Sequence, residues 1–439
     1  MNAPRIGWYG DDFTGATDTL AVLAQAGLRA LLFMEVPSAA QRAAAGPLDA
    51  VGLAGAARAM APEAMRAELS AVGAFFEQLA PPVLHYKVCS TFDSSPQVGS
   101  IGCAVQTLRA FAPNPWIPIV GGQPSLGRYC AFSNLFAAAG TGGVVHRIDR
   151  HPTMRQHPVT PMKEADLRRH LAAQGLTNLA ALHYPAYAGG DAALDDALAS
   201  ALDGPMLLDV AASEHLAPVG RLLWQQAQRA RLLAVGSSGV AQALVAHWQA
   251  DGWQADGVQA VMPKAVSAPG PVFALAGSLS PLTARQVAAA HSYQRITVPG
   301  HVMARDDRLA GPLDEVARLL DAGQHVLVCT APAPGEPADT ACAVQIAQAS
   351  ARFVARVLAR QASAGRPLRR VGIAGGDTSS HAVKALSLWG LSCAGTLCPG
   401  VTLSRAHSHD PAFEGLELML KGGQMGAENL FEQLLRWPR

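Results

Sequence analysis

Two carboxylates stand side by side near the start of the chain, in the segment GDDFTG at residues 10–15. A short apolar run precedes them, and a stretch of helical period follows them. Adjacent carboxylates at a strand end repel each other, so Asp11 and Asp12 indicate a functional site. One could accept a proton from a hydroxyl, while the other could hold a substrate or a hydrated cation. The structural alternative is a helix cap formed by Asp12 or Thr14.

Cationic groups follow two further predicted strands, at 50–53 and 83–87. Lys87 ends the second of these strands, and Ser and Thr hydroxyls come soon after it. A lysine at the carboxyl end of a parallel strand can bind an anion, and hydroxyls add hydrogen bonds. Arg58 follows the first strand and could clamp a carboxylate with two hydrogen bonds. The alternatives are a solvated lysine in a polar turn and an ordinary surface arginine.

Three turns of small residues end predicted strands in the second half of the chain: AGSLSPLT at 276–283, GIAGGDTSS at 372–380 and KGGQMG at 421–426. Small residues let main-chain N–H groups approach a phosphate at a helix N-terminus. One such turn is weak evidence, but three together predict a nucleotide-phosphate cradle. The chain has neither a Walker loop nor a Gly-x-Gly-x-x-Gly fingerprint in its first βα unit. The segment HSHD at 407–410 is either a metal site or a polar loop.

Short apolar runs alternate with helical stretches, which predicts an α/β fold of two domains, each a mainly parallel sheet flanked by helices. The domains are expected at 1–255 and 270–439, joined by a Gly/Pro/Ala-rich linker at 256–269. A Gly/Pro-rich gap at 331–339 predicts a surface loop. Ligands gather at the carboxyl ends of strands in such sheets. The predicted strands are 5–9, 30–33, 50–53, 83–87, 116–120, 206–209, 232–235, 272–276, 295–298, 325–329, 370–374 and 416–420.

Composition excludes several classes of partner. Hydrophobic residues make up 50% and charged residues 15% of the 439 residues, which is typical of well-packed domains. The net charge of +1, from 34 basic and 33 acidic residues, predicts binding to neither nucleic acid nor membrane. The sequence has no apolar run long enough for a membrane span and no secretion signal at its start. The seven cysteines are scattered, so we expect free thiols and a cytoplasmic protein that binds small molecules.

Taken in order, these segments resemble the four-carbon acid sugar kinase family, whose members phosphorylate threonate, erythronate or 3-oxo-tetronate with ATP. The segment at 11–18 is similar to the family's opening Asp-Asp-Leu-Thr-Gly-Ala-x-Asp motif. Residues 87–91 with 99–102 are similar to its Lys-x-Asp-Ser-Thr and Gly-Asn-Ile-Gly segments. The three glycine-rich turns resemble its ATP-contacting motifs. The resemblance covers nearly the whole chain.

The resemblance implies a substrate-binding N-terminal domain, a nucleotide-binding C-terminal domain and an active site in the cleft between them. Cys89 stands where the family commonly has aspartate, the segment after it is longer and carries Asp93, and Asp377 replaces a usual glutamate. The first two departures leave the identity of the acid open. The implied substrate contacts are Asp11, Asp12, Arg58, Lys87, Cys89, Ser90 and Thr91, and the implied ATP contacts are Ser278, Gly375, Gly376, Asp377, Thr378 and Gly423.

The expected reaction is phosphoryl transfer from ATP with Mg²⁺ to a hydroxyl of a four-carbon, 3-oxo or branched sugar acid, including 3-oxo-isoapionate. Asp12 is the expected base, and Asp377 competes with it as base or magnesium ligand. We expect a homodimer, although the sequence does not identify an interface. Two other classes stay open: a sugar-acid-binding regulator without activity, and an oxidoreductase or an aldolase that would use Lys87 as a Schiff-base lysine.

Overall fold

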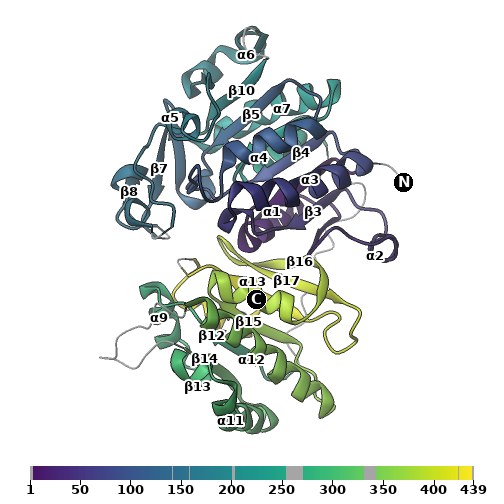
Figure 1. The fold of residues 1–439 in the computed structure, drawn as a ribbon, viewed down its shortest axis with the longest axis vertical. Helices are drawn as coiled ribbons and strands as arrows, with labels where there is room; N and C mark the ends of the chain where they lie inside the picture. The colour runs from purple at the N-terminus through teal and green to yellow at the C-terminus, as the bar shows by residue number, and fades with distance from the viewer. Residues whose placement is uncertain are drawn as a thin grey trace. The chain divides into compact units, whose positions relative to one another are not determined.

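The computed structural model describes residues 3–140, 142–157, 159–199, 203–253, 270–330, 343–423 and 425–437. The chain divides into two compact units, Met1–Val261 and Met262–Arg439, called here the N-terminal and C-terminal units (Figure 1). The predicted linker at 256–269 and the predicted loop at 331–339 lie outside the described residues. The fold is α/β, as the sequence predicts.

A parallel sheet forms the centre of the N-terminal unit. Its strands lie in the order β2-β3-β1-β4-β11-β5-β10-β9, and every pairing among them is parallel. Consecutive strands are joined through helices, as parallel pairing requires. The strands are β1 (Ile6–Gly10), β2 (Ala30–Phe33), β3 (Ala50–Ala54), β4 (Val83–Lys87), β5 (Trp116–Gly121), β9 (Ala180–Leu182), β10 (Gly204–Asp209) and β11 (Leu232–Gly236).

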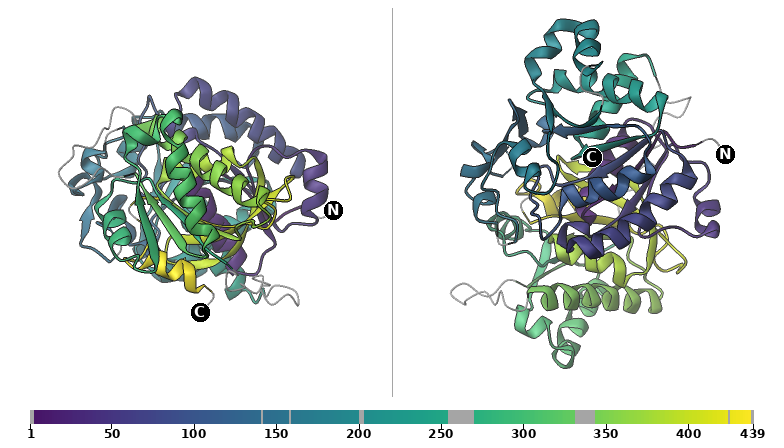
Figure 2. Two further views of the ribbon diagram at one scale, coloured as in Figure 1. Left: turned by 90° about the horizontal axis from the view of Figure 1, so that it is seen from below. Right: turned by 45° about the horizontal axis from the view of Figure 1, so that its top comes forward.

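Helices cover both faces of this sheet (Figures 1 and 2). On one face α3 packs against α4, and on the other α8 packs against both α7 and α1. Arg5, just before β1, lies within 5.8 Å of the rings of three tryptophans on this second side: Trp224, Trp248 and Trp253. The helices are α1 (Phe13–Gln25), α2 (Ala39–Ala45), α3 (Pro62–Leu79), α4 (Ile101–Leu108), α5 (Leu167–Ala172), α6 (Gly190–Ala199), α7 (Leu216–Arg229) and α8 (Gly239–Ala250).

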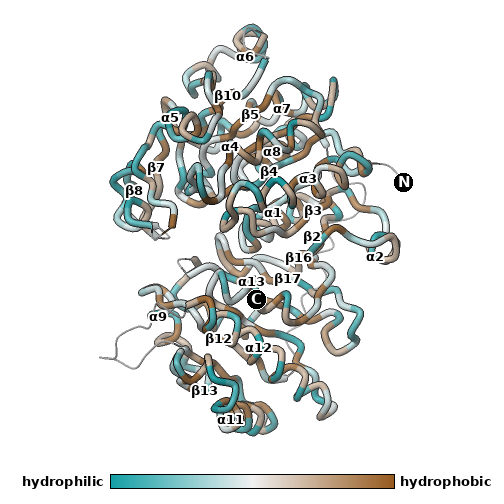
Figure 3. Tube along the Cα trace, viewed as in Figure 1, coloured by the Kyte–Doolittle hydropathy of each residue, from teal (hydrophilic) through white to brown (hydrophobic). Residues whose placement is uncertain are grey.

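Strands such as β1 and β4 are buried on both faces, which is why they read as continuous apolar runs rather than as alternating patterns. The fully buried side chains include Trp8, Trp116 and Phe76, and burial of one such ring stabilises the fold by about 1.5–3 kcal/mol. The helices instead alternate hydrophilic and hydrophobic residues, as the hydropathy colouring shows (Figure 3). This difference in pattern is what made the strands predictable.

A small antiparallel sheet, ordered β6-β7-β8, was not predicted. Its strands are β6 (Arg128–Ala131), β7 (Asn134–Ala138) and β8 (Val145–Arg147). β6 and β7 are joined by a two-residue turn in which Phe132 and Ser133 both have positive φ. Because this turn lacks the usual Asn-Gly or Gly-Gly pair, the sequence gives little sign of a hairpin here. Asp209 holds the turn by accepting hydrogen bonds from both main-chain N–H groups.

The C-terminal unit contains a sheet ordered β13-β14-β12-β15-β18-β17-β16. The first five strands are parallel, whereas β17 runs antiparallel to β18 and β16. The long β16–β17 hairpin was not predicted, because β16 has register shifts and an irregular burial pattern. The strands are β12 (Phe273–Ala276), β13 (Tyr293–Thr297), β14 (His325–Cys329), β15 (Arg370–Ala374), β16 (Leu388–Cys398), β17 (Val401–Ser408) and β18 (Glu417–Lys421).

Helices also cover this sheet: α12 contacts α11 and α13, while α14 contacts α9. Arg370, fully buried on β15, donates two hydrogen bonds to Glu417 and two to the carbonyls of Leu434 and Trp437. This network ties the C-terminal helix to the sheet. The helices are α9 (Pro281–Ala288), α10 (Gly300–Met303), α11 (Ala310–Asp321), α12 (Ala343–Ser363), α13 (Gly376–Ala385) and α14 (Leu430–Arg436). In the described parts of both units, no helix is long and apolar enough to span a membrane.

Candidate active site

The ends of three neighbouring strands bring the predicted acidic and basic residues together. Gly10, the last residue of β1, lies opposite Ala54 of β3 and Lys87 of β4. The turn after β1 carries Asp11 and Asp12, and the turn after β3 leads to Arg58. Parallel strands in register end at the same edge of the sheet. The central position of β1 therefore places its two carboxylates between the two cationic side chains.

Arg58 joins both carboxylates in one ion-pair cluster. Its Nη2 lies 2.7 Å from Asp11 Oδ1 and 2.8 Å from Asp12 Oδ1, and its Nε donates to Asp11 Oδ2 at 3.2 Å. Lys87 Nζ reaches Asp12 Oδ1 at 3.3 Å. Asp11 and Lys87 are nearly inaccessible, with side chains 6% and 5% exposed, whereas Asp12 is 25% exposed. Asp12 is thus the carboxylate of this cluster that a ligand can contact.

The two carboxylate oxygens of Asp12 have different surroundings. Oδ1 accepts from Arg58, from Lys87 and, as the N-cap of α1, from the N–H of Gly15 at 3.0 Å. Oδ2 accepts from the Thr14 hydroxyl at 2.7 Å. The predicted helix cap at Asp12 is therefore confirmed, and its functional role stays a prediction. Oδ2 keeps acceptor capacity for a further hydroxyl, because a carboxylate oxygen can accept two hydrogen bonds.

Glycines make room for this cluster. A Cβ at Gly15 would lie 1.5 Å from Lys87 Nζ, so the lysine passes directly over the first turn of α1. Gly99, at φ 63°, would place a Cβ 2.5 Å from the carbonyl oxygen of Arg58. The main chain of Arg58 is held further by its N–H, which donates to Asp11 O at 2.9 Å. The arginine is therefore oriented by its backbone as well as by its side chain.

Charge and burial act differently on the two aspartates. Burial raises the pKa of Asp11, against the opposing effect of Arg58 and Lys87. Burial also opposes ionisation of Asp12, but Arg58 and Lys87 hold the pKa of Asp12 well below its usual range. Asp12 is consequently ionised at neutral pH, which suits a group that accepts a hydrogen bond. A strongly lowered pKa also makes it a weak proton acceptor.

The segment after β4 forms a chain of hydrogen bonds. The Cys89 thiol lies 2.9 Å from Thr91 Oγ1, which donates to Asp93 Oδ1 at 2.5 Å. Since the hydroxyl has one proton, the thiol donates to it. Burial, reinforced by Asp93, raises the pKa of Cys89 to about 11, so the thiol is neutral. Ser90 has no hydrogen bond to any described residue and so keeps its hydroxyl available.

Buried contacts hold the loop that follows β4 in place. Phe92 is fully buried and has φ 54°, an unfavourable conformation that surrounding contacts must maintain. Ser94 lies 2.9 Å from His170 Nε2 and accepts from Gln174 Nε2 at 2.8 Å. Gln174 also accepts from the N–H of Ile101 at 2.8 Å. The loop that follows Lys87 is therefore rigid, and its shape depends on contacts with α4 and α5.

In the C-terminal unit the three glycine-rich turns converge. A Cβ at Gly277 or Gly375 would meet Thr378 Oγ1, at 2.5 and 3.1 Å, and a Cβ at Gly423 would lie 2.5 Å from Ser278 Oγ. Gly375 is the N-cap of α13 at φ 139°. Main-chain contacts join the turns, because Gly277 N–H donates to Ala374 O and Gly375 N–H to Lys421 O. The predicted nucleotide contacts therefore lie together, around the starts of α9 and α13.

Lys421 and the first turn of α9 hold the third glycine-rich turn in place. Ser280 and Thr283 both donate to Gly423 O, the second at 3.1 Å. Lys421 Nζ lies 3.0 Å from Thr283 Oγ1 and 3.3 Å from the carbonyl oxygens of Gly423 and Met425. Its side chain is buried, and burial lowers the pKa of Lys421 to about 8. Lys421 is thus a positioning residue.

Asp377 differs from Asp12 in being exposed and unpaired. It lies in the first turn of α13 and forms no hydrogen bond or ion pair with a described residue. A free carboxylate beside a phosphate cradle is the kind of oxygen ligand that Mg²⁺ takes together with phosphate oxygens. The 407–410 segment has a different arrangement, with His407 bonded to Ser392 and near Glu414. The described residues contain no group of three or more His, Cys, Asp or Glu placed to hold a metal.

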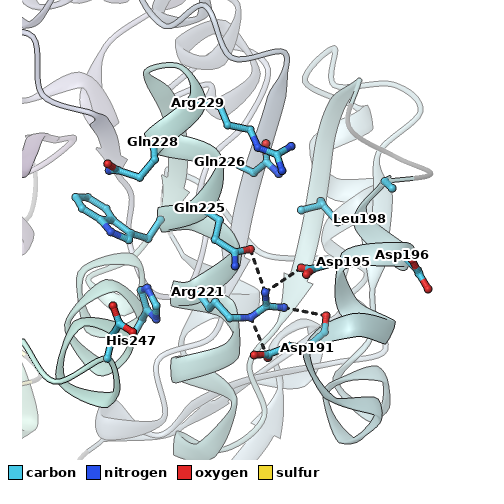
Figure 4. Close-up of a pocket in the computed structure, with 13 residues that line it drawn as sticks. Asp191, Asp195, Asp196, Leu198, Arg221, Gln225, Gln226, Gln228, Arg229 and His247 are labelled. Atoms are coloured by element: carbon cyan, nitrogen blue, oxygen red, sulfur yellow. Dashed lines mark hydrogen bonds and ion pairs between the residues drawn. The ribbon is translucent and has the colours of Figure 1, made fainter.

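A cavity of about 880 Å³ lies elsewhere, among helices α6, α7 and α8 (Figure 4). Arg221 spans it, pairing with Asp191 and Asp195 at 2.9 Å and with Gln225 at 3.0 Å. The cationic group is therefore neutralised within the protein. None of the predicted site residues lines this cavity, and its acidic lining is unsuited to an anionic ligand.

Sequence reasoning identified the charged groups of the site but missed several residues that hold them. Thr14 and Gly15 belong to the opening motif, yet their contacts to Asp12 and Lys87 depend on the folded turn. Lys421 and Thr283 belong to two of the glycine-rich turns, but only their burial and their hydrogen bond to each other show that they position the third turn.

Comparison with known proteins places these features in context. A family model described as a sugar-binding N-terminal domain matches residues 6–244, and one described as a nucleotide-binding C-terminal domain matches residues 273–431. A 3-oxo-isoapionate kinase of Paraburkholderia graminis is 40% identical, over 97% of this chain and 93% of its own. A 3-oxo-tetronate kinase of Methylobacterium radiotolerans is 30% identical, over 98% of each chain.

Solved structures share the fold. A crystal structure from Salmonella typhimurium LT2, described as a putative tRNA synthase, has a TM-score of 0.80 and 25% identity, covering 98% of both chains. A Haemophilus influenzae protein of the DUF1537 family has a TM-score of 0.73 at 22% identity, covering 98% of this chain and 99% of its own. The second likeness concerns fold alone.

Proposed function

The chain belongs to the four-carbon acid sugar kinase family (DUF1537) and is an ATP-dependent sugar-acid kinase; on that premise we propose that it phosphorylates a 3-oxo sugar acid, with 3-oxo-isoapionate as the preferred substrate. The observation that carries this proposal is the 40% identity, over nearly the full chain, to a 3-oxo-isoapionate kinase. The division of labour proposed is acid binding by residues 1–255 and nucleotide binding by residues 270–439.

The loop after β4 supports a 3-oxo or branched acid. Where the family commonly has an aspartate, this chain has a neutral thiol that is engaged with Thr91. The nearby carboxylate, Asp93, is buried and bonded within the loop. This loop therefore offers no free carboxylate to accept a hydrogen bond from a second substrate hydroxyl, whereas a carbonyl group at that position needs no acceptor. Cys89 and Thr91 would shape this pocket, and Ser90 would donate to the substrate.

We assign the reacting hydroxyl to Asp12. Its Oδ2 would accept the hydroxyl hydrogen bond and orient one oxygen lone pair toward the γ-phosphorus of ATP. The hydroxyl oxygen then bonds to phosphorus, the bond to the β–γ bridging oxygen breaks, and ADP leaves. Transition states of this reaction are loose, so a weak base suffices when positioning is good. The proton would pass to Asp12 late in the reaction, and Asp377 is the competing acceptor.

Ser278, Gly375, Gly376, Thr378 and Gly423 would surround the ATP phosphates. Main-chain N–H groups at the start of α13 suit phosphate oxygens. Asp377 would hold Mg²⁺, which neutralises phosphate charge when bound. A carboxylate beside the phosphates would otherwise repel them, so its exposed and unpaired state favours a bridging cation. We also propose that the chain forms a homodimer, and sedimentation velocity of the purified chain measures this oligomeric state.

The test is an ATP-consumption screen over 3-oxo-isoapionate, 3-oxo-tetronate, threonate and erythronate, with phosphorus NMR of each product. We expect the highest kcat/KM with 3-oxo-isoapionate. Cys89→Asp should move the preference toward the hydroxy acids, while Cys89→Ser, the neutral control, should not. Binding of the acids without ADP release would support a regulator instead. Equal kcat/KM values for all four acids would refute the proposed preference.

A further inference from the structure

Arg128 opens β6 and holds the turn between β5 and the small sheet. Its Nη1 donates to three carbonyl oxygens, those of Leu126 at 2.8 Å, Gly127 at 3.3 Å and Ala138 at 3.2 Å. One nitrogen of the guanidinium is therefore fully used by the main chain. This arrangement fixes the position of the group without neutralising its charge.

The rest of the guanidinium is without partners among the described residues. Nε is buried and lacks an acceptor, Nη2 forms no hydrogen bond, and no carboxylate pairs with Arg128. A structural arginine in this chain looks different: Arg231 donates from Nε, Nη1 and Nη2 to three separate carbonyls. Arg58 and Arg221, which are partly buried like Arg128, and the fully buried Arg370 each pair with a carboxylate.

Arg128 is partly buried and its Nε is shielded from solvent, and leaving such a group without an anion is costly. Burial lowers the pKa of Arg128, and the opposing effect comes from Cys89 and Tyr129 and from no carboxylate. Such a group is expected where a ligand supplies the missing anion. Arg128 therefore combines a structural role at Nη1 with two nitrogens, Nε and Nη2, that are left for a ligand.

Arg128 lies within electrostatic range of Cys89, which stands two residues beyond Lys87 in the loop that follows β4. The main chains of Arg128 and Gln123 pair in both directions, at 2.8 and 3.2 Å. Gln123 in turn donates to Asp18 Oδ2 on α1 at 3.0 Å. The turn that carries Arg128 is thus tied to the helix that Asp12 caps.

The two cations of the ion-pair cluster are balanced by its two carboxylates, so a bound acid needs a further cation. Arg58 and Lys87 are matched by Asp11 and Asp12, so their charges are already compensated. A sugar acid brings one further negative charge that this cluster does not balance. Arg58 and Lys87 were predicted to hold the carboxylate of the acid, yet Nε and Nη2 of Arg58 already hold Asp11 and Lys87 Nζ already pairs with Asp12.

We infer that Arg128 binds the carboxylate of the substrate through the nitrogens that the protein leaves without an acceptor, and so selects acids over neutral sugars. This inference rests on the proposed function, in that it takes the substrate to be a sugar acid. It transfers the role of carboxylate binding from Arg58 to Arg128. Arg58 then orients Asp12.

The test compares one acid, the best substrate of the screen, with its primary amide, which has the same shape and no charge. Arg128→Gln should lower kcat/KM for the acid by about 10²-fold and change it by less than about 3-fold for the amide, because a hydrogen bond to a charged group is lost. Arg147→Gln is the matched control, since this arginine lies in the same small sheet and pairs with Asp149 at the surface. It should leave both values unchanged.

Arg128→Lys is a second, conservative variant that controls for loss of folding. Circular dichroism and thermal unfolding measure whether each variant is folded. A lysine keeps the charge but cannot serve three carbonyls and a carboxylate together, so kcat/KM for the acid should fall about 10-fold. An unchanged ratio of acid to amide in both variants would overturn the inference. If the wild type phosphorylates no sugar acid, the proposed function fails by itself. Calorimetric titration of the acid into wild type and Arg128→Gln then still measures carboxylate binding.

Discussion

The polar site of the N-terminal unit is made of ionised side chains, whereas that of the C-terminal unit is made of glycines, hydroxyls and main-chain groups. In the first, four charges interlock, and each depends on the others for its orientation. In the second, one buried lysine and two hydroxyls hold a turn whose function would lie in its N–H groups. A pocket that must distinguish one acid from another benefits from directional side chains. A triphosphate is bound well by repeated main-chain donors.

The largest effect should come from removing the charge of Asp12. Asp12→Asn keeps a good N-cap for α1 but loses the carboxylate that binds the reacting hydroxyl, so kcat should fall by about 10² or more. The ADP-release assay measures kcat, and the KM for ATP should stay unchanged. Asp49→Asn is the control, because Asp49 is ion-paired with Arg29 before β3, at the opposite end of that strand from the site. An unchanged kcat with a raised KM for the acid would leave Asp12 only a binding role.

Arg58→Ala tests whether the charges of the first site depend on one another. Asp11, almost buried, would lose its partner, so the free energy of unfolding should fall by about 2 kcal/mol. The KM for the acid should rise because Asp12 would lose its orientation, while the KM for ATP should not. Thermal unfolding and steady-state kinetics give these quantities. The control is Arg29→Ala, which breaks an exposed ion pair and should lower the free energy of unfolding by at most about 1 kcal/mol. A rise in the KM for ATP in Arg58→Ala would contradict the assignment of the acid to the N-terminal unit and of ATP to the C-terminal unit.

Gly423→Ala is the corresponding test in the second site. The new Cβ would lie 2.5 Å from Ser278 Oγ, so the turn must shift and the KM for ATP should rise about 10-fold. The KM for the acid should be unchanged. Gly311→Ala is the control, because a Cβ at Gly311 meets no atom within 4 Å. A rise in the KM for the acid as well as in the KM for ATP would contradict the independence of the two sites.

The smallest effect concerns the buried lysine and its dependence on pH. Because the pKa of Lys421 is lowered to about 8 in the folded protein, the unfolded chain binds more protons between pH 8 and about 10.5. The contribution of Lys421 to the free energy of unfolding should therefore rise, by on the order of 1 kcal/mol, as the pH increases from 8 to about 10.5. Calorimetry of wild type and Lys421→Met at pH 7 and 10 isolates the effect. A difference between the two proteins that does not change with pH would contradict the lowered pKa.

Much of the fold could be predicted because its signals are local. Doubly buried strands read as apolar runs, and their bounds agree with the predicted ranges within a few residues for β1, β4, β14 and β15. The small sheet and the β16–β17 hairpin escaped prediction for a physical reason. The first turns through Phe132 and Ser133 at positive φ, and the second has register shifts. The turn of the small sheet is held by contacts with Asp209 instead of by the usual turn residues.

The sequence by itself determined the α/β class, the family and the kinds of group at the strand ends, because apolar runs, glycine turns and paired carboxylates are properties of short segments. Only the tertiary structure decided which charges neutralise one another. Asp11, Arg58 and Lys87 come from three strands, and their contacts depend on β1 lying between β3 and β4. The sequence predicts Arg58 as a carboxylate clamp because it does not reveal the pairing with Asp11 and Asp12. The partners of Arg58, and the unpartnered state of Arg128, are set by distances between residues far apart along the chain.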